Sequence, residues 1–301
     1  MKEIIKKAIP EYLWKWLTYI YLLLIRSNEC YDYRIKMKLF GRDYERLPEY
    51  CDEINYMKKK NKLVMFPYPF IEKYQNRKIN VLFDPDLKLH YVIHQGKRLY
   101  YPSDMDEERI KNVYLSILVE QDEESPHCYF SKEYEFEENA VFMDVGCAEG
   151  NMALTVADKA KSLFLFEGEE RWMPALKATF LPYADKVYIN NKIVGDNVGK
   201  KETTIDAIMD EYRPEGNIYI KIDAEGSEKK IIRGAERTIN TCNVKCACCT
   251  YHRQNDAAEL KEFFQKKGFI YEFSKGYVLF KAQKRIKYPY FRKGLIRVKN
   301  Y

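Results

Sequence analysis

The sequence predicts an α/β fold in which helices cover both faces of a mostly parallel, seven-stranded sheet that closes with a terminal antiparallel hairpin. Two observations predict it. From residue 140 onward, short apolar segments alternate with helical segments, and turn residues separate them. The apolar segments are hydrophobic along their whole length, which is typical of parallel strands buried on both faces. In such a sheet, ligands bind at the carboxyl ends of the strands.

The expected elements follow one another along the second half of the chain. Strands are expected at residues 140–145, 162–167, 186–190, 217–223 and 244–251. Helices are expected at residues 151–161, 171–183, 203–212, 228–239 and 257–268. Residues 269–274 and 277–282 would form the closing hairpin around Lys275-Gly276. Together these elements give a sheet wound on both sides by helices.

The first part of the chain is less regular, and we assign residues 1–97 to an N-terminal accessory region and residues 98–301 to the α/β domain. The apolar run from Trp16 to Ile25 is too short for a membrane span, which needs about 20 residues. It could lie at a membrane interface, but packing on the protein itself or on a partner subunit is favoured. Short strands are expected within residues 78–102, and a helix over residues 105–121.

The composition, the net charge and the cysteines limit the class of protein and its partners. The 301 residues are 46% hydrophobic, which supports a large core, and the net charge of +6 is too small to indicate a nucleic-acid partner. The eight cysteines form no secreted framework and no signal peptide is evident, so reduced thiols in the cytoplasm are expected. The cluster Cys246, Cys248 and Cys249 could bind metal, but buried apolar cysteines in a strand are favoured.

The stretch VFMDVGCAEGN, residues 141–151, joins the first strand to the first helix. Gly146 permits a sharp turn and a close approach to a ligand, and Gly150 opens a helix whose N-terminus attracts negative charge. Ala148 stands where dinucleotide-binding proteins have the middle glycine of G-x-G-x-x-G. Asp144, at the end of the strand, would repel a pyrophosphate but suits a cationic or amino-bearing ligand.

The second strand ends in Glu167, a good acceptor for two ribose hydroxyls. Three features are thus present: a carboxylate that suits an amine, a glycine loop, and an acid that suits ribose. Together they describe a site for S-adenosylmethionine better than a site for a nicotinamide. The candidate cofactor-binding residues are Asp144, Gly146, Ala148, Glu149, Gly150, Asn151 and Glu167.

A second group of polar residues follows the fourth and fifth strands. Asp223 and Glu225 stand at the end of the fourth strand in IKIDAEGSE, and His252 leaves the fifth strand in CTYHRQND. Because adjacent parallel strands finish at the same edge, these three side chains form a candidate acid/base or metal site. If Asp223, Glu225 and His252 bind a metal, Mg²⁺ or Mn²⁺ suits this oxygen-rich set better than zinc.

Five segments resemble the FkbM-type methyltransferases in their order along the chain. They are DVGCAEGN, LFEGEE, the helix TTIDAIM, IKIDAEGSEKKIIRGA and TYHRQNDAAELKEFFQKKGF. The resemblance covers residues 125–283, and K-I-D-x-E-G-x-E is its most specific part. It extends weakly to VEQDEESPHCY (119–129) and to PYFRKGLIR (289–297). Cys147 departs from the family, which usually has alanine there.

The resemblance implies a Rossmann-like class I methyltransferase fold, S-adenosylmethionine as the methyl donor, and O-methylation. The acceptor would be a hydroxyl, often of a sugar in a polysaccharide, a glycolipid or a glycosylated natural product. By the same resemblance, Asp144, Gly146, Gly150 and Glu167 would bind the cofactor, whereas Asp223, Glu225 and His252 would face the acceptor.

A methyl group on a sulfonium is already activated, so the enzyme has to align the acceptor oxygen and remove its proton. His252 or Asp223 would be the base, while Glu225 would orient the acceptor or complete a site for a divalent metal. A nicotinamide-dependent oxidoreductase on the same fold and a non-catalytic binding protein remain as alternatives.

The expected partners follow from the ends of the chain. Residues 281–301 carry eight Lys or Arg and no acid, so this tail could grip phosphate, anionic lipid or a polyanionic glycan, or lie solvated over the domain. With the N-terminal segment, it could bring the protein to the inner face of a membrane and to a lipid-linked acceptor. No nucleic-acid partner is expected, and the oligomeric state stays open.

Overall fold

The structure is a computed structural model that describes residues 27–41, 46–281 and 287–301. The chain divides into two compact units, residues 1–68 and 69–301. The N-terminal apolar run and two cations of the tail, Lys284 and Arg285, lie outside the described residues. None of the helices that the structure describes is long and apolar enough to cross a membrane.

The described part of the smaller unit is helical. It contains α3 (Ser27–Phe40), the 3₁₀ turn η2 (Pro48–Tyr50) and α4 (Cys51–Lys60). Its fully buried apolar side chains are Ile35 and Leu39 of α3 and Ile54 and Met57 of α4. On each helix these residues recur at a spacing of three or four, which places them on one face.

The larger unit begins with η3 (Pro69–Tyr74) and a three-stranded antiparallel sheet. Its strands are β1 (Leu82–Asp84), β2 (Leu89–His94) and β3 (Lys97–Tyr100), so the short strands predicted within residues 78–102 are confirmed. They belong to the larger unit, whereas the sequence placed its domain boundary at residue 97. Helix α5 (Glu107–Glu120) follows, and the side chain of Asp106 caps it by accepting from Arg109 N–H.

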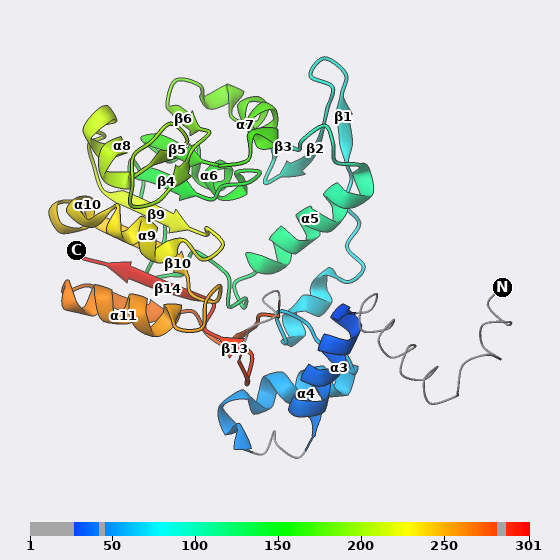
Figure 1. Ribbon diagram of the computed structural model, residues 1–301. Helices are drawn as coiled ribbons and strands as arrows, with labels where there is room; N and C mark the ends of the chain where they lie inside the picture. Colours follow the sequence, from blue (N-terminus) through cyan, green and yellow to red (C-terminus); the bar gives the residue numbers. More distant parts are fainter. Residues whose placement is uncertain (1–26, 42–45, 282–286) are drawn as a thin grey trace, which may run out of the picture. The chain divides into compact units, whose positions relative to one another are not determined.

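Strands and helices then alternate as predicted. The elements are β4 (Val141–Val145), α6 (Asn151–Val156), β5 (Ser162–Phe166), η4 (Glu170–Trp172), α7 (Met173–Thr179), η5 (Leu181–Tyr183), β6 (Val187–Asn190), β7 (Ile193–Val194), β8 (Glu202–Thr203), α8 (Ile205–Tyr212), β9 (Ile218–Ile222), α9 (Glu228–Arg233), α10 (Glu236–Thr241), β10 (Val244–Cys249), α11 (Asp256–Lys266), β11 (Ile270–Phe273), β12 (Val278–Leu279), β13 (Phe291–Arg292) and β14 (Leu295–Lys299). Seven of the strands form one sheet in the order β11-β14-β10-β9-β4-β5-β6 (Figure 1).

The pairing within this sheet confirms the α/β, Rossmann-like fold. The pairs β4–β5, β5–β6, β4–β9 and β9–β10 are parallel, and β14 runs antiparallel to both β10 and β11. Every residue of β4, β9 and β10 is buried, as expected for central strands covered on both faces. The carboxyl ends of β4, β5, β9 and β10 therefore finish at one edge.

The antiparallel pair at the end of the sheet is not the predicted one. Residues 277–282 were expected to pair with residues 269–274, but β11 pairs with β14, and β12 pairs with β13 instead. Strand β14 lies between β10 and β11, so residues 295–299 of the basic tail are neither solvated nor a free cationic surface. Burial of Leu295, Ile296 and Val298 stabilises this arrangement.

Two arginines of the tail have hydrogen-bond partners within the protein. Arg297 donates to the carbonyl oxygen of Tyr129 at 3.0 Å and forms an ion pair with Glu272 at 2.7 Å. Arg292 is buried and donates to the carbonyl oxygen of Tyr251. Such charge-assisted bonds allow a cationic segment to enter a sheet. Contact of the tail with a membrane or a polyanion stays a prediction.

The helix predicted over residues 228–239 is interrupted at Gly234. A Cβ there would lie 1.9 Å from the carbonyl oxygen of Gly195, so only glycine admits this approach. Beyond the break, the Asp206 carboxylate accepts from the backbone N–H groups of Arg237 and Thr238 at 3.0 and 2.9 Å. These bonds satisfy donors at the start of α10 and explain why two short helices replace one.

Candidate functional site

The loop after β4, residues 146–150, is tied to both neighbouring strands. The N–H groups of Gly146 and Cys147 donate to the carbonyl oxygen of Phe166 on β5 at 3.0 and 3.1 Å. On the other side, Asp223 N–H donates to the carbonyl oxygen of Val145 at 3.1 Å. Gly146 has a φ of 71°, and a Cβ there would lie 1.9 Å from the carbonyl oxygen of Asp223. The glycine therefore lets the loop approach the end of β9.

We expect Gly146→Ala to lower the free energy of unfolding by about 2–4 kcal/mol. A left-handed φ costs an alanine about 1–2 kcal/mol, and displacing a packed backbone adds about 1–3 kcal/mol. Gly268→Ala is the matched control, because Gly268 has a φ of 79° but open space around its Cβ position. Urea unfolding of both variants measures the difference. Equal losses would show that the approach to Asp223 does not constrain residue 146.

A first cavity, pocket A, opens at the ends of β4 and β5. Its volume is about 580 Å³, within the range of small-molecule sites. Glu167 lies at its rim, and its two carboxylate oxygens accept from Ala148 N–H at 3.0 Å and Glu169 N–H at 2.8 Å. Its lining also includes the charged side chains of Glu169, Lys192 and Glu225 and several apolar side chains, namely Val145, Phe166, Trp172, Ile193 and Val194. Pocket A thus offers a fixed carboxylate beside apolar walls.

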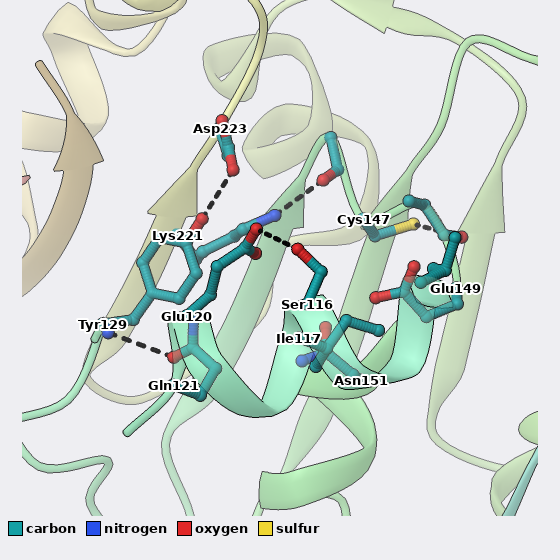
Figure 2. A pocket seen from close by; sticks show the side chains of 13 residues that line it. Ser116, Ile117, Glu120, Gln121, Tyr129, Cys147, Glu149, Asn151, Lys221 and Asp223 are labelled. Atoms are coloured by element: carbon teal, nitrogen blue, oxygen red, sulfur yellow. Dashed lines mark hydrogen bonds between the residues drawn. The ribbon is translucent and has the colours of Figure 1, made fainter. Parts of the chain in front are cut away.

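A second cavity, pocket B, has a volume of about 260 Å³ and is shown in Figure 2. One wall is α5, which contributes Val113, Ser116, Ile117 and Glu120, and Gln121 follows directly after the helix. The remaining lining comes from Tyr129, from Gly146, Cys147, Ala148 and Glu149 of the loop, from Asn151 at the start of α6, and from Lys221 and Asp223 of β9 and its end. Gly146, Ala148 and Asp223 line both cavities, so pockets A and B meet at the loop.

The structure places Asp144 beneath this loop. Asp144 is 1% exposed and lines neither pocket. Lys221, directly opposite on β9, brings its Nζ to 3.0 Å from Asp144 Oδ1 and donates to the carbonyl oxygen of Gly146 at 2.6 Å. Burial opposes the charge of Lys221, but Asp144 and Asp223 outweigh it and raise the pKa of the lysine. Asp144 therefore holds Lys221 under the loop, which differs from the direct ligand contact that the sequence predicts.

Asp223, Glu225 and His252 lie close together, as their positions at the sheet edge predict. The Nε2 atom of His252 is 3.5 Å from Asp223 Oδ1 and 3.8 Å from Glu225 Oε2. Asp223 lines both pockets, and Glu225 lines pocket A with its side chain 90% exposed. His252 is buried behind them. The cluster therefore consists of the exposed carboxylate of Glu225, the carboxylate of Asp223 that lines both pockets, and the buried imidazole of His252.

Glu228 fixes the orientation of the His252 ring. Its Oε1 lies 2.7 Å from His252 Nδ1 and also accepts from the N–H groups of Ala224 and Gly226 at 3.2 Å each. Because Nδ1 is held in this way, Nε2 faces Asp223 and Glu225. Burial lowers the pKa of His252, but Glu228, Asp223 and Glu225 outweigh it and raise the pKa above its ordinary value. This is a carboxylate–histidine pair with its second nitrogen directed at the site.

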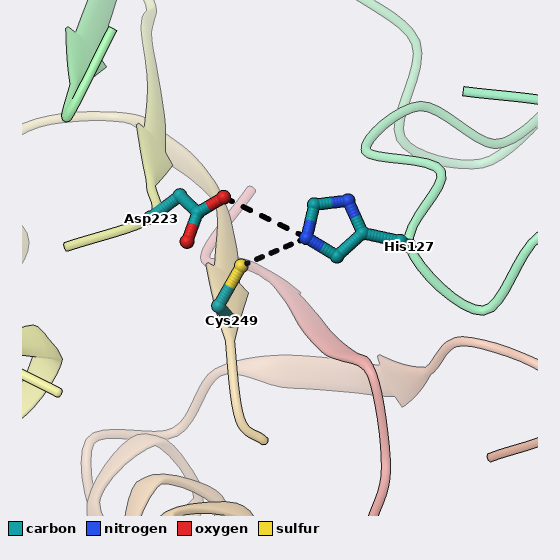
Figure 3. A group of neighbouring side chains, drawn as sticks. All are labelled: His127, Asp223 and Cys249. Carbon is teal, nitrogen blue, oxygen red and sulfur yellow. Dashed lines mark hydrogen bonds and ion pairs between the residues drawn. The ribbon is translucent and has the colours of Figure 1, made fainter. Parts of the chain in front are cut away.

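Two further residues support Asp223 from a segment that motif analysis did not single out. The Tyr129 hydroxyl donates to Asp223 Oδ2 at 2.7 Å, and His127 Nε2 lies 3.6 Å from the same oxygen (Figure 3). Burial lowers the pKa of His127 to about 4, so this imidazole is neutral at pH 7. Burial alone would raise the pKa of Asp223, but His127, Lys221, His252 and Tyr129 lower it to about 2. The available signal was the SPHCY segment, part of the weaker resemblance at residues 119–129.

Two groups of side chains in the described part of the chain are compact enough to consider for a metal ion. They are His127, Asp223 and Cys249, and Asp223, Glu228 and His252. Glu228, and not the predicted Glu225, completes the second group. Its Oε1 is already hydrogen-bonded to His252 Nδ1, and His127 Nε2 lies 3.0 Å from the Tyr251 hydroxyl. Hydrogen bonds thus occupy these ligand atoms, and Mg²⁺ or Mn²⁺ binding stays a prediction.

The cysteines of β10 are free and buried, as expected. Cys246 and Cys248 lie in the apolar core on one face of the sheet. Cys249 faces the other way, with its sulfur 3.7 Å from the Tyr129 hydroxyl. The alternation of a strand separates the three thiols, so they do not form one metal site.

A comparison with protein families decides the classification. The family model described as the methyltransferase FkbM domain matches residues 66–271, more than half of the chain. The chain belongs to the FkbM methyltransferase family. Enzymes of this family take the methyl group from S-adenosylmethionine, and the family membership agrees with the resemblance found at residues 125–283.

Individual relatives are distant from this FkbM methyltransferase. The ribosomal RNA small subunit methyltransferase A of Staphylococcus haemolyticus is 33% identical over 70 residues, which are 23% of this chain and 24% of that protein. The solved methyltransferase FkbM from Methylobacillus flagellatus KT is 17% identical, with a TM-score of 0.43, and the match covers 64% of this chain and 55% of that one. For the precorrin-6y C5,15-methyltransferase from Geobacter metallireducens the identity is 12%, the TM-score 0.38, and the coverage 56% and 85%.

Proposed function

We propose that the protein transfers the methyl group of S-adenosylmethionine to a hydroxyl oxygen of a sugar-containing acceptor. The acceptor class comprises polysaccharides, glycolipids and glycosylated natural products. The observation that carries the proposal is the meeting of pockets A and B at Asp223, beside the Nε2 atom of an imidazole that Glu228 orients. Donor pocket and proton acceptor are thus adjacent.

The residues present fit the cofactor. In pocket A, the Glu167 carboxylate would accept from the ribose hydroxyls, and the apolar walls would hold the adenine ring. In pocket B, carboxylates suit the positively charged end, while the Asn151 amide can donate to a carboxylate. When bound, the cofactor supplies an electrophilic methyl group on a sulfonium.

The acceptor hydroxyl needs a base, and His252 suits this role better than Asp223. A carboxylate whose pKa is about 2 is a weak base, although it accepts hydrogen bonds well. His252 has a raised pKa, and its Nε2 can take the proton while Nδ1–H stays bonded to Glu228. Asp223 and Glu225 would then accept hydrogen bonds from neighbouring hydroxyls and align the nucleophile.

The charge of this edge favours a neutral, hydroxyl-rich acceptor. Asp223 and Glu225 would repel the phosphates of a nucleic acid, so the RNA named for the curated relative is not the acceptor that we propose. Four further expectations rest on the sequence alone: a lipid-linked acceptor, contact with the inner face of a membrane, a cytoplasmic location and self-association. Family membership argues against the nicotinamide-dependent alternative.

The proposal is tested by methyl transfer from S-adenosylmethionine labelled in its methyl group. The protein is incubated with a panel of glycosides and polysaccharides, with an amine panel and an RNA as comparisons. Label in an alkali-stable methyl ether of a sugar is the expected result, and mass spectrometry locates the hydroxyl. Transfer only to amines or RNA would contradict the acceptor class. Binding of the donor without transfer to any panel would favour a non-catalytic protein.

A further inference from the structure

We propose that Glu120 of α5, together with Glu149, binds the ammonium group at the amino-acid end of the cofactor in pocket B. This inference rests on the proposed use of S-adenosylmethionine and assigns a ligand to a residue outside the strand-end motifs. Glu120 is the last residue of α5 and faces the cavity beside Tyr129 and Lys221 (Figure 2).

The two carboxylates are held in place but not neutralised. The Ser116 hydroxyl donates to Glu120 Oε1 at 3.1 Å, which fixes that side chain against the helix. Glu149 is only 7% exposed and lines pocket B. Within the part of the chain that the structure describes, the one hydrogen bond to its carboxylate comes from its own backbone. A buried carboxylate that receives no hydrogen bond from another residue and lines a cavity suits a cationic ligand.

The charges that face pocket B do not balance. Three carboxylates line it, those of Glu120, Glu149 and Asp223, and the cation among its lining residues is Lys221. The ammonium group of Lys221 is already taken by Asp144 and by the carbonyl oxygen of Gly146. A ligand ammonium has three donors and would compensate the excess negative charge.

The protonation of the two acids reflects this imbalance. Burial, followed by the charge of Asp223, raises the pKa of Glu120 to about 8, although Ser116 and Lys221 oppose the rise. Burial raises the pKa of Glu149 to about 7, with Asp144 and Glu167 adding to the rise and Lys221 opposing it. At neutral pH, Glu120 is therefore largely protonated when the pocket holds no cation. A bound ammonium favours the ionised form, so binding releases a proton.

The sign of the pH dependence follows. Below the pKa of Glu120, its ionised fraction falls about tenfold for each pH unit. The affinity for a ligand with the ammonium group should level off above about pH 8, weaken by up to about tenfold per unit between about pH 8 and pH 7, and weaken more steeply below the pKa of Glu149, about 7. A ligand that lacks the amino-acid end should show no such slope.

The test is calorimetric titration of the intact chain with two ligands, S-adenosylhomocysteine and 5′-methylthioadenosine, which lacks the amino-acid end. Titrations run between about pH 6 and pH 9 in two buffers of different ionisation enthalpy, so that proton release is measured directly. We expect S-adenosylhomocysteine to bind more tightly as the pH rises from about 6 to 8 and to release between one and two protons near pH 7. We expect methylthioadenosine to do neither.

Variants separate recognition from folding. Glu120→Gln should weaken S-adenosylhomocysteine binding about tenfold or more at pH 8, make its pH slope shallower and leave methylthioadenosine binding unchanged. Glu149→Gln should act in the same direction, and Glu108→Gln, on the exposed face of α5, is the matched control. Wild-type affinity and slope in Glu120→Gln would overturn the inference, as would an equal loss of both ligands. If the unmodified protein binds neither ligand, the proposed function fails as well.

Discussion

Replacing His252 with glutamine is expected to lower kcat by about 10² to 10⁴-fold, the usual contribution of a positioned general base. His252 lines neither pocket, so binding of S-adenosylhomocysteine should change little. Kinetics with the acceptor found by methyl transfer measure kcat, and calorimetry measures the binding. His90→Gln, on strand β2 and outside both pockets, is the control.

The pH profile tests the same residue in a second way. The base must be neutral, so kcat should rise with pH as His252 loses its proton, with a midpoint above 6.5. Glu228→Gln removes the charge that holds the imidazolium, so the midpoint should move to lower pH while kcat falls. Unfolding of Glu228→Gln is measured in parallel, because the Glu228 carboxylate is buried. An unchanged midpoint, or wild-type kcat in His252→Gln, would reassign the base.

Replacing Glu167 with alanine is expected to weaken S-adenosylhomocysteine binding about 100-fold. Two hydrogen bonds from ribose hydroxyls to a carboxylate are worth about 1.5–3 kcal/mol each, and the low end of their sum is already about 3 kcal/mol. The loop should also loosen, since Glu167 accepts from the N–H groups of Ala148 and Glu169. Calorimetric titration measures the dissociation constant.

The neighbouring Glu170→Ala serves as the control, because Glu170 is exposed and outside pocket A. It carries the same charge and should leave the affinity within about twofold, as expected for a surface substitution. If Glu167→Ala binds as tightly as the unmodified protein, pocket A does not hold the ribose. If both variants lose affinity equally, only the overall negative charge of this surface matters.

Much of the fold could be predicted because each central strand can be recognised from its own apolar residues. Strands β4, β9 and β10 are apolar along their whole length, which the sequence shows directly. The partner of β11 could not be predicted in this way. Strand β14 contains Arg297 and Lys299 and looks like a solvated tail, and its burial depends on partners such as Glu272 that are distant in sequence.

The residues of the functional site also fall into those that the sequence predicts and those that depend on contacts in the folded protein. Glu167, Asp223, Glu225 and His252 stand at strand ends, where the topology of a parallel sheet brings residues together. The role of Asp144 depends on the register between β4 and β9, which places Lys221 opposite it and which periodicity does not show.

Residues outside the alternating strands and helices carried weaker signals. Glu120 and His127 come from α5 and the segment after it, so no strand-end rule pointed to them. Each contributes only once the helix and the segment pack against the sheet edge. Glu228 is the last residue of the segment IKIDAEGSE, but its contact with His252 Nδ1 requires the folded loop.

The most direct test of the account is thermal unfolding of the protein with excess S-adenosylhomocysteine, compared with NAD⁺. A ligand at 100 times its Kd stabilises the native state by about 2.7 kcal/mol. For a domain of this size the Tm should rise by about 5 to 10 °C with S-adenosylhomocysteine, and not with NAD⁺. A rise with NAD⁺ alone, or with neither compound, would contradict the assignment of pockets A and B to the methyl donor.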